Sequence, residues 1–184
     1  MKQQLFFVGV IAFIMSCIAC NNNSGSSASM ASDSIVAANA AKDSILAKNK
    51  ATALAAVKTL SLQTIDQAFK DVTPDAIDYG DGSGKPIKGV DSIKAAVKSF
   101  LTAFPDMKGE NYTVIGDGNV VAVFGEYTAT FKAPLMGIKP TGKKFTKVRD
   151  VDVFTFNDAG KITEHRSIQA PITYLSEVGA QMKK

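Results

Sequence analysis

The hydrophobic pattern divides the chain into an apolar leader, a polar stretch and a long series of alternating elements. Residues 51–69 are rich in helix formers and carry apolar side chains at steps of three and four, which predicts a helix. Residues 75–86 have the pattern of a short strand that runs into a glycine-rich turn. A second helix is predicted over 91–104, with Asp91 as its N-cap and a Phe-Pro pair at its end.

The chain after Pro105 has the composition of β-strands. Its segments are rich in β-branched and aromatic residues and are separated by turn residues, which predicts strands over 111–115, 120–131, 144–156 and 161–168. Residues 171–178 are expected to end the domain as a short helix or a loop. Helices followed by a meander of antiparallel strands predict the α+β class.

The N-terminus has the pattern of an export signal. Lys2 precedes an apolar run over 5–15, which is shorter than the ~20 residues that a membrane-spanning helix needs. Small residues then lead to Cys17 and Cys20, and a run of Asn, Ser and Gly follows. This arrangement resembles the lipobox of bacterial lipoproteins, in which a cysteine becomes the lipidated first residue of the mature chain.

The lipobox resemblance implies how the chain is organised. Cys20, which follows a small Ala19, is the better candidate for lipidation, and Cys17 is the alternative. We expect a signal peptide over 1–19, a flexible tether over 20–31, a helical stalk over 32–49 and a globular domain over 50–184. The protein would then be exported and held at the periplasmic or cell-surface side of a bacterial membrane by its lipid anchor alone. A plain secreted protein with a leftover thiol is the alternative.

The composition narrows the chemistry of the folded part. Both cysteines fall within the first 20 residues and the chain has one histidine, which excludes a disulfide framework and a zinc site built on Cys or several His. Removal of the leader takes Lys2 from the 21 basic residues, so 20 basic residues face 17 acidic ones and the net charge is +3. That charge is too small for a typical nucleic-acid-binding protein. We therefore expect no metal, no cofactor and no nucleic-acid partner.

Five segments of the chain resemble, in the same order, those of a known family. They are residues 104–107, the loop 136–143, and residues 150–156, 160–165 and 175–180. The series closely resembles the SnoaL-like family of polyketide and ester cyclases, within the nuclear-transport-factor-2-like superfamily, over about residues 50–180. The resemblance implies a cone: a bent antiparallel sheet wraps around the N-terminal helices and leaves a mostly apolar cavity open at one end. It leaves the activity open, because this fold hosts hydrolases, isomerases, cyclases and inactive binding modules.

Asp152 and His165 are the candidate catalytic residues. Alternation along 144–156 places Asp152 among apolar neighbours, where a carboxylate can act as a general base or can bridge to a cation or a loop. His165 is the single imidazole and is either the partner in proton transfer or a structural residue. The resemblance implies an acid/base aspartate near the C-terminal end of the sheet, where this chain has Ser167 and Ala170 in place of carboxylates.

Four further residues are candidates for ligand binding. Tyr79 stands where relatives often have a histidine, and Tyr127 has the amphipathic character of a cavity wall. Arg149 ends a run of six cations that begins at Lys132, and Arg166 replaces the tryptophan usual in the family. Such cations would favour an anionic ligand, contact lipid head groups or simply line a solvated hairpin.

Two functions follow from these residues. The first is a lipid-anchored domain that binds a small hydrophobic molecule, with an anionic group as one option, and whose catalysis is not assured. The alternative is a metal-free cyclase, isomerase or hydrolase that moves protons on a small carbonyl substrate through Asp152 and His165. The lost carboxylates and tryptophan favour the first. Apolar residues on both faces of the strand over 120–131 also predict a homodimer through the outer face of the sheet.

Overall fold

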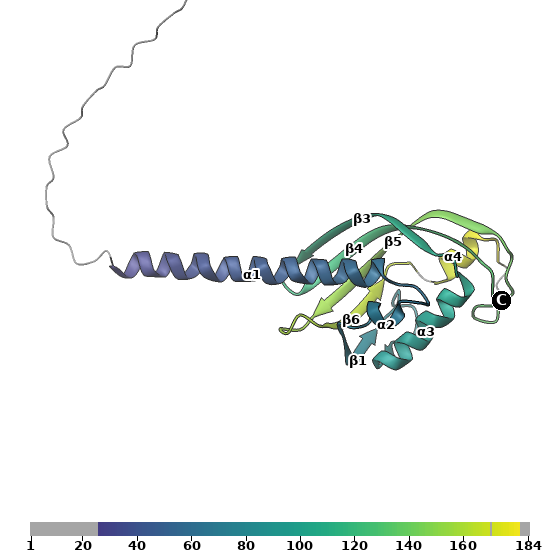
Figure 1. Ribbon diagram of the computed structural model, residues 1–184, viewed down its shortest axis with the longest axis horizontal. Coiled ribbons are helices and arrows are strands. Elements are labelled where there is room, and N and C mark those ends of the chain that lie inside the picture. Colours follow the sequence, from purple (N-terminus) through teal and green to yellow (C-terminus); the bar gives the residue numbers. More distant parts are fainter. Residues whose placement is uncertain (1–25, 170, 181–184) are drawn as a thin grey trace, which may run out of the picture. The chain divides into compact units, whose positions relative to one another are not determined.

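The computed structural model describes residues 26–169 and 171–180 (Figure 1). The chain divides into two units, 1–38 and 39–184. The described part of the first unit is helical and belongs to α1 (Ser26–Lys58). This helix includes residues 26–31, which the sequence had indicated as tether. The expected signal peptide, Cys17 and Cys20 lie outside the described residues.

The second unit is an α+β domain, and the predicted fold class is confirmed. The helices after α1 are α2 (Ile65–Ala68), α3 (Val90–Ala103) and α4 (Pro171–Glu177). The strands are β1 (Val72–Asp78), β2 (Ile87–Lys88), β3 (Lys108–Asp117), β4 (Val120–Thr130), β5 (Lys144–Phe156) and β6 (Ile162–Ser167). They form one open, bent sheet in the order β2-β1-β6-β5-β4-β3, and the long strands β3 to β5 are visibly curved in Figure 1. No helix among the described residues is long and apolar enough to cross a membrane.

The prediction of one helix over 51–69 is wrong. Helix α1 ends at Lys58, and α2 is a separate single turn. The Thr59 hydroxyl donates to the carbonyl of Ala55 at 2.7 Å, and the Ser61 hydroxyl accepts from the backbone N–H of Thr64 at 3.3 Å. These hydroxyl side chains bind backbone groups where the helix ends, although the apolar spacing continues.

Two details of the next elements also differ from the prediction. Gly89, with a φ of 87°, precedes the first residue of α3, so Asp91 lies in the first helical turn and is not the N-cap. The pairing of β1 with β6 is parallel, whereas a purely antiparallel sheet was expected. This parallel pairing sets Asp78 directly opposite His165 and thereby joins the start of the domain to its last strand.

The inner face of the sheet carries two apolar clusters with a polar strip between them. One cluster joins α3 and α4 to the ends of β4 and β5, and it includes Phe104, Phe131, Phe145, Leu175 and Val178. The other packs α1 against the opposite ends of the same strands, and it includes Ala53, Val121, Val123, Phe154 and Phe156. Between these clusters, the inward-facing residues are Gly125 and Tyr127 on β4 and Asp150 and Asp152 on β5.

Candidate functional site

His165 lies between two carboxylates on the inner face of the sheet. Its Nε2 is 3.0 Å from Oδ1 of Asp152, and its Nδ1 is 3.1 Å from Oδ1 of Asp78. The antiparallel β5–β6 pair and the parallel β1–β6 pair bring these three side chains together. The side chains of Asp78, Asp152 and His165 remain 15%, 18% and 26% exposed, so solvent reaches all three. We call these three residues the imidazole clamp.

The clamp keeps its imidazole charged. A neutral imidazole has one N–H, whereas both nitrogens of His165 here face carboxylate oxygens. Burial alone would lower the pKa of His165, but the hydrogen bonds and charges of Asp152 and Asp78 outweigh it and raise this pKa to about 10. Burial likewise opposes ionisation of Asp78, and the hydrogen bond and charge of His165 together with the Gly80 N–H hold its pKa below the ordinary value.

Tyr127 extends the clamp by one residue. Its hydroxyl donates to Oδ2 of Asp152 at 2.9 Å, so both oxygens of Asp152 accept a hydrogen bond. Burial, and then the charge of Asp152, raise the pKa of Tyr127 far above its ordinary value. The phenol therefore remains a neutral donor at physiological pH.

Glycines make room for the aromatic rings beside the clamp. A Cβ on Gly125 would lie 3.1 Å from ring atoms of both Tyr112 and Tyr127, and one on Gly109 would lie 2.0 Å from the Tyr112 hydroxyl oxygen. The two tyrosine rings meet edge to face at 6.5 Å, and the Phe154 ring lies 5.1 Å from the imidazole of His165. Aromatic rings thus flank Tyr127 and the clamp.

Asp150 has a structural role. It is 7% exposed and accepts four hydrogen bonds: from the backbone N–H groups of Val151 and Gln169, and from the hydroxyls of Ser167 and Tyr174. Burial and then the charge of Asp150 raise the pKa of Tyr174, which stays protonated as a donor. These bonds fasten α4 and the segment after β6 to the sheet.

The structure does not bring the other candidate residues to the clamp. The guanidinium carbon of Arg166 lies 4.2 Å from the ring centre of Tyr79, so these two side chains stack on each other. Tyr79 directly follows Asp78, and Arg166 directly follows His165. Because successive residues of a strand point to opposite faces, both side chains project from the outer face of the sheet. The side chain of Arg149 is 87% exposed and pairs with Glu126 at 3.5 Å. Of the predicted site residues, Asp152, His165 and Tyr127 are assembled together.

Asp78 is the clamp residue that the sequence analysis did not propose. Its position at the end of a short strand beside a glycine-rich turn gave no sign of a partner 87 residues away. The available signal was a carboxylate at a strand end, which is too common to identify a site.

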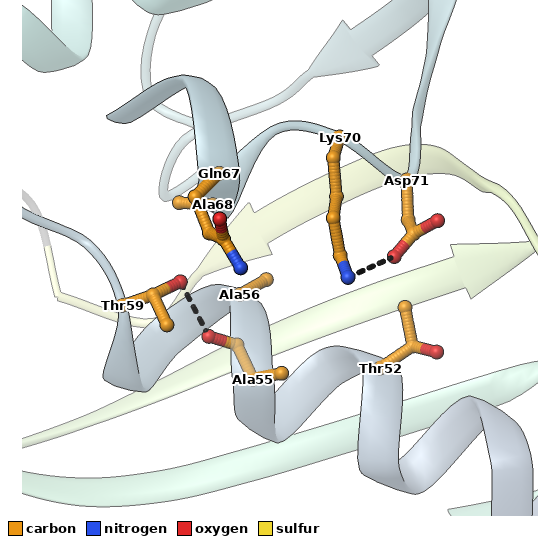
Figure 2. Close-up of a pocket in the computed structure, with 8 residues that line it drawn as sticks. All are labelled: Thr52, Ala55, Ala56, Thr59, Gln67, Ala68, Lys70 and Asp71. Atoms are coloured by element: carbon orange, nitrogen blue, oxygen red, sulfur yellow. Dashed lines mark hydrogen bonds and ion pairs between the residues drawn. The ribbon is translucent and has the colours of Figure 1, made fainter. Parts of the chain in front are cut away.

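Two small cavities of the structure lie away from the clamp. One holds about 40 Å³ between α1 and α2, and Figure 2 shows its lining, with the Lys70 ammonium 4.0 Å from the Asp71 carboxylate. The other holds about 20 Å³ beside Leu101 and Phe104. Both are far smaller than ligand pockets of ~300–1,000 Å³. Within the described ranges, no group of three or more His, Cys, Asp or Glu is placed to hold a metal ion.

The comparisons with known proteins agree with this architecture. The family model described as SnoaL-like polyketide cyclase matches residues 50–176, about two thirds of the chain. The chain belongs to this family. A search of curated proteins gave no match.

Solved structures of SnoaL-like and related proteins have the same fold. AclR of Streptomyces galilaeus is 25% identical over 73% of this chain and 97% of its own, with a TM-score of 0.61. A SnoaL-like protein of Jannaschia sp. CCS1 is 21% identical over 75% of this chain and 96% of its own, with a TM-score of 0.65. An NTF2-like protein of Burkholderia pseudomallei is 16% identical over 71% of this chain and 97% of its own, with a TM-score of 0.57. The predicted family and its NTF2-like fold are thus confirmed, and family membership suggests a small-molecule-binding or cyclase-type function.

Proposed function

We propose that this SnoaL-like domain binds a small molecule with an apolar body on the open inner face of its sheet, at the imidazole clamp. The observation that carries the proposal is His165 held between Asp78 and Asp152 while all three side chains stay partly exposed. Charged groups beside apolar walls cost free energy to desolvate, and clusters of such groups in an accessible position are typical of functional sites. Asp150 fastens α4 and the segment after β6 to the sheet, so these elements do not depend on the clamp.

The walls of the proposed site suit an apolar ligand body. Tyr112, Tyr127 and Phe154 flank the clamp, and aromatic rings contribute large contact areas with few rotatable bonds. Because the side chains of Asp78, Asp152 and His165 are partly exposed, the ligand would reach them from the open inner face of the sheet.

The second candidate is acid/base catalysis on a small carbonyl substrate, as the family name suggests. Asp152 would be the base and His165 the proton donor. The partial exposure of Asp152 favours this alternative. Both N–H groups of His165 are engaged by carboxylates, however, so a step that uses this imidazole first has to break one of these bonds. For this reason binding is the primary proposal.

The experiment is native mass spectrometry of the protein purified from its own host. We expect a retained small molecule on the wild type and on Asp158→Asn, a control carboxylate that is exposed in the turn after β5. Asp152→Asn should release it. If the wild type carries no added mass, the binding proposal fails. Turnover of an identified ligand that drops ~10²-fold in Asp152→Asn with binding retained would favour the enzyme instead.

Lipid anchoring and export are also part of the proposal. The apolar run over 5–15, the small residues before Cys20 and the Asn/Ser run after it support lipidation at Cys20. A multiply acylated cysteine is sufficient to hold a domain at a membrane surface.

A homodimer through the outer face of the sheet completes the proposal. Ile115, Val120 and Phe124 are exposed large hydrophobic side chains on β3 and β4, and we call them the outer patch. Phe124 pairs in register with Val151 of β5, which extends the apolar surface. A contiguous apolar patch of this kind is typical of an association surface.

A further inference from the structure

The hydrogen-bond donors of the clamp and of Tyr127 are already engaged by the carboxylates of the clamp. His165 directs both ring nitrogens at carboxylates, and the Tyr127 hydroxyl donates to Asp152. None of these three N–H or O–H groups is left to meet an incoming ligand. The ring of Tyr112 lies 6.5 Å from that of Tyr127, and its hydroxyl can accept as well as donate.

Some acceptor atoms at the clamp can still accept a hydrogen bond. Both hydrogen bonds to Asp78 fall on Oδ1, and its Oδ2 accepts none within the described part of the chain. The oxygen of Tyr127 keeps a lone pair, because the hydroxyl acts as donor toward Asp152. The unused capacity of the site is therefore mainly for accepting hydrogen bonds.

The net charge of the clamp is −1. Two carboxylates and one imidazolium sum to this value, and moving a proton from the imidazolium to a carboxylate does not change it. Across residues 26–169 and 171–180, no lysine or arginine lies within ion-pair distance of Asp78 or Asp152. Arg149 pairs with Glu126 instead.

We propose that the ligand carries a hydrogen-bond donor, either a hydroxyl or a protonated amine, at the end that meets the clamp, and that a carboxylate is disfavoured there. This inference rests on the proposed function, since it concerns the ligand of the same site. It replaces the anionic ligand considered from the sequence, because the cations that suggested one are not at the clamp.

The test uses three small probes that share one phenyl ring: benzylamine, benzyl alcohol and benzoate. Each is titrated at pH 7 into the ¹⁵N-labelled full chain in detergent, and the amide signals of Asp78, Asp152 and His165 are followed. We expect benzylamine to bind ~10-fold or more tightly than benzoate, because a single charge at contact distance changes sign between the two. Benzyl alcohol should fall between them.

The variants test whether the clamp charge sets this order. Asp152→Asn should reduce the preference for benzylamine over benzyl alcohol, and Asp158→Asn should leave it unchanged. Benzoate binding at these signals as tightly as benzylamine overturns the donor inference and leaves the binding site standing. If none of the three probes moves these signals, the site itself is overturned. The wild-type series decides both questions even if a variant fails to fold.

Discussion

The hydroxyl of Tyr174 donates a 2.8 Å hydrogen bond to Asp150 and so ties helix α4 to the middle of strand β5. Two residues along the same strand face, Asp152 accepts from His165 and Tyr127 instead. One aspartate is saturated by structural donors, whereas the other belongs to a chain of titratable groups that solvent reaches. We therefore expect substitution of Asp150 to lower the stability of the fold, and substitution of Asp152 to weaken ligand binding.

Asp150→Asn should destabilise the domain. The amide places an NH₂ against groups that are themselves donors, and we expect the free energy of unfolding to fall by about 3 kcal/mol. Tyr174→Phe removes a single donor and should reduce it by about 1 kcal/mol. Urea denaturation measures both. Equal stability of Asp150→Asn and the exposed control Asp158→Asn would contradict the structural role.

The stability of the fold should fall at alkaline pH, because His165 loses its proton there. Its pKa in the folded protein, about 10, lies above the ordinary 6.5. Protonation of this group therefore stabilises the fold fully below pH 6.5, and the contribution is lost as the pH rises through 10. The urea midpoint of the wild type should fall more between pH 7 and 10 than that of His165→Gln. Parallel curves for the two proteins would show that the clamp does not hold the proton.

Gly125→Ala should disturb the clamp from the neighbouring strand. The added Cβ would lie 3.1 Å from ring atoms of Tyr112 and Tyr127 and from the Tyr127 hydroxyl, so the bond from Tyr127 to Asp152 should lengthen or break. Binding of benzylamine should weaken as a result. Gly84→Ala, at a position with open space and no special φ, is the matched control. A crystal structure of Gly125→Ala with the bond intact would refute this.

Phe124→Glu should convert a dimer to a monomer. The substitution places a charge within the outer patch, where desolvation would disfavour association. Light scattering gives the mass. Met136→Glu changes an equally apolar exposed residue in the loop between β4 and β5 and should leave the dimer intact. A wild type that is monomeric at high protein concentration would exclude the dimer.

Cys20→Ala should abolish lipidation. In the native host, a palmitate analogue should label the wild type, and the label should disappear from Cys20→Ala and persist in Cys17→Ala. The reverse result would assign the anchor to Cys17. Label that survives when both cysteines are replaced would exclude lipidation at either residue.

Local sequence patterns predicted most of the sheet. The strand over 144–156 has the bounds of β5, and that over 120–131 ends one residue beyond β4. Alternation placed Asp152 among apolar residues, because this property depends on period-two geometry alone. The same alternation explains why Arg166 does not share a site with His165.

The remaining features depend on contacts between distant parts of the chain. The parallel pairing of β1 with β6, which brings Asp78 to His165, leaves no trace in the local hydropathy of either strand. The break after Lys58 depends on which backbone groups the hydroxyls of Thr59 and Ser61 bind, whereas the apolar spacing continues through it. Pattern reasoning therefore found strands and faces but did not find the second carboxylate of the clamp.

The β1–β6 pairing also sets the point in synthesis at which the clamp can assemble. Asp78 leaves the ribosome early, and its partners arrive only with β5 and β6, near the end of synthesis. A chain that is truncated before residue 162 would keep α1 to α3 and the long strands β3 to β5, but it would lack α4, the imidazole of His165 and the strand β6 that pairs with β1. If the chain is exported N-terminus first, as proposed, the clamp can assemble only after translocation is almost complete.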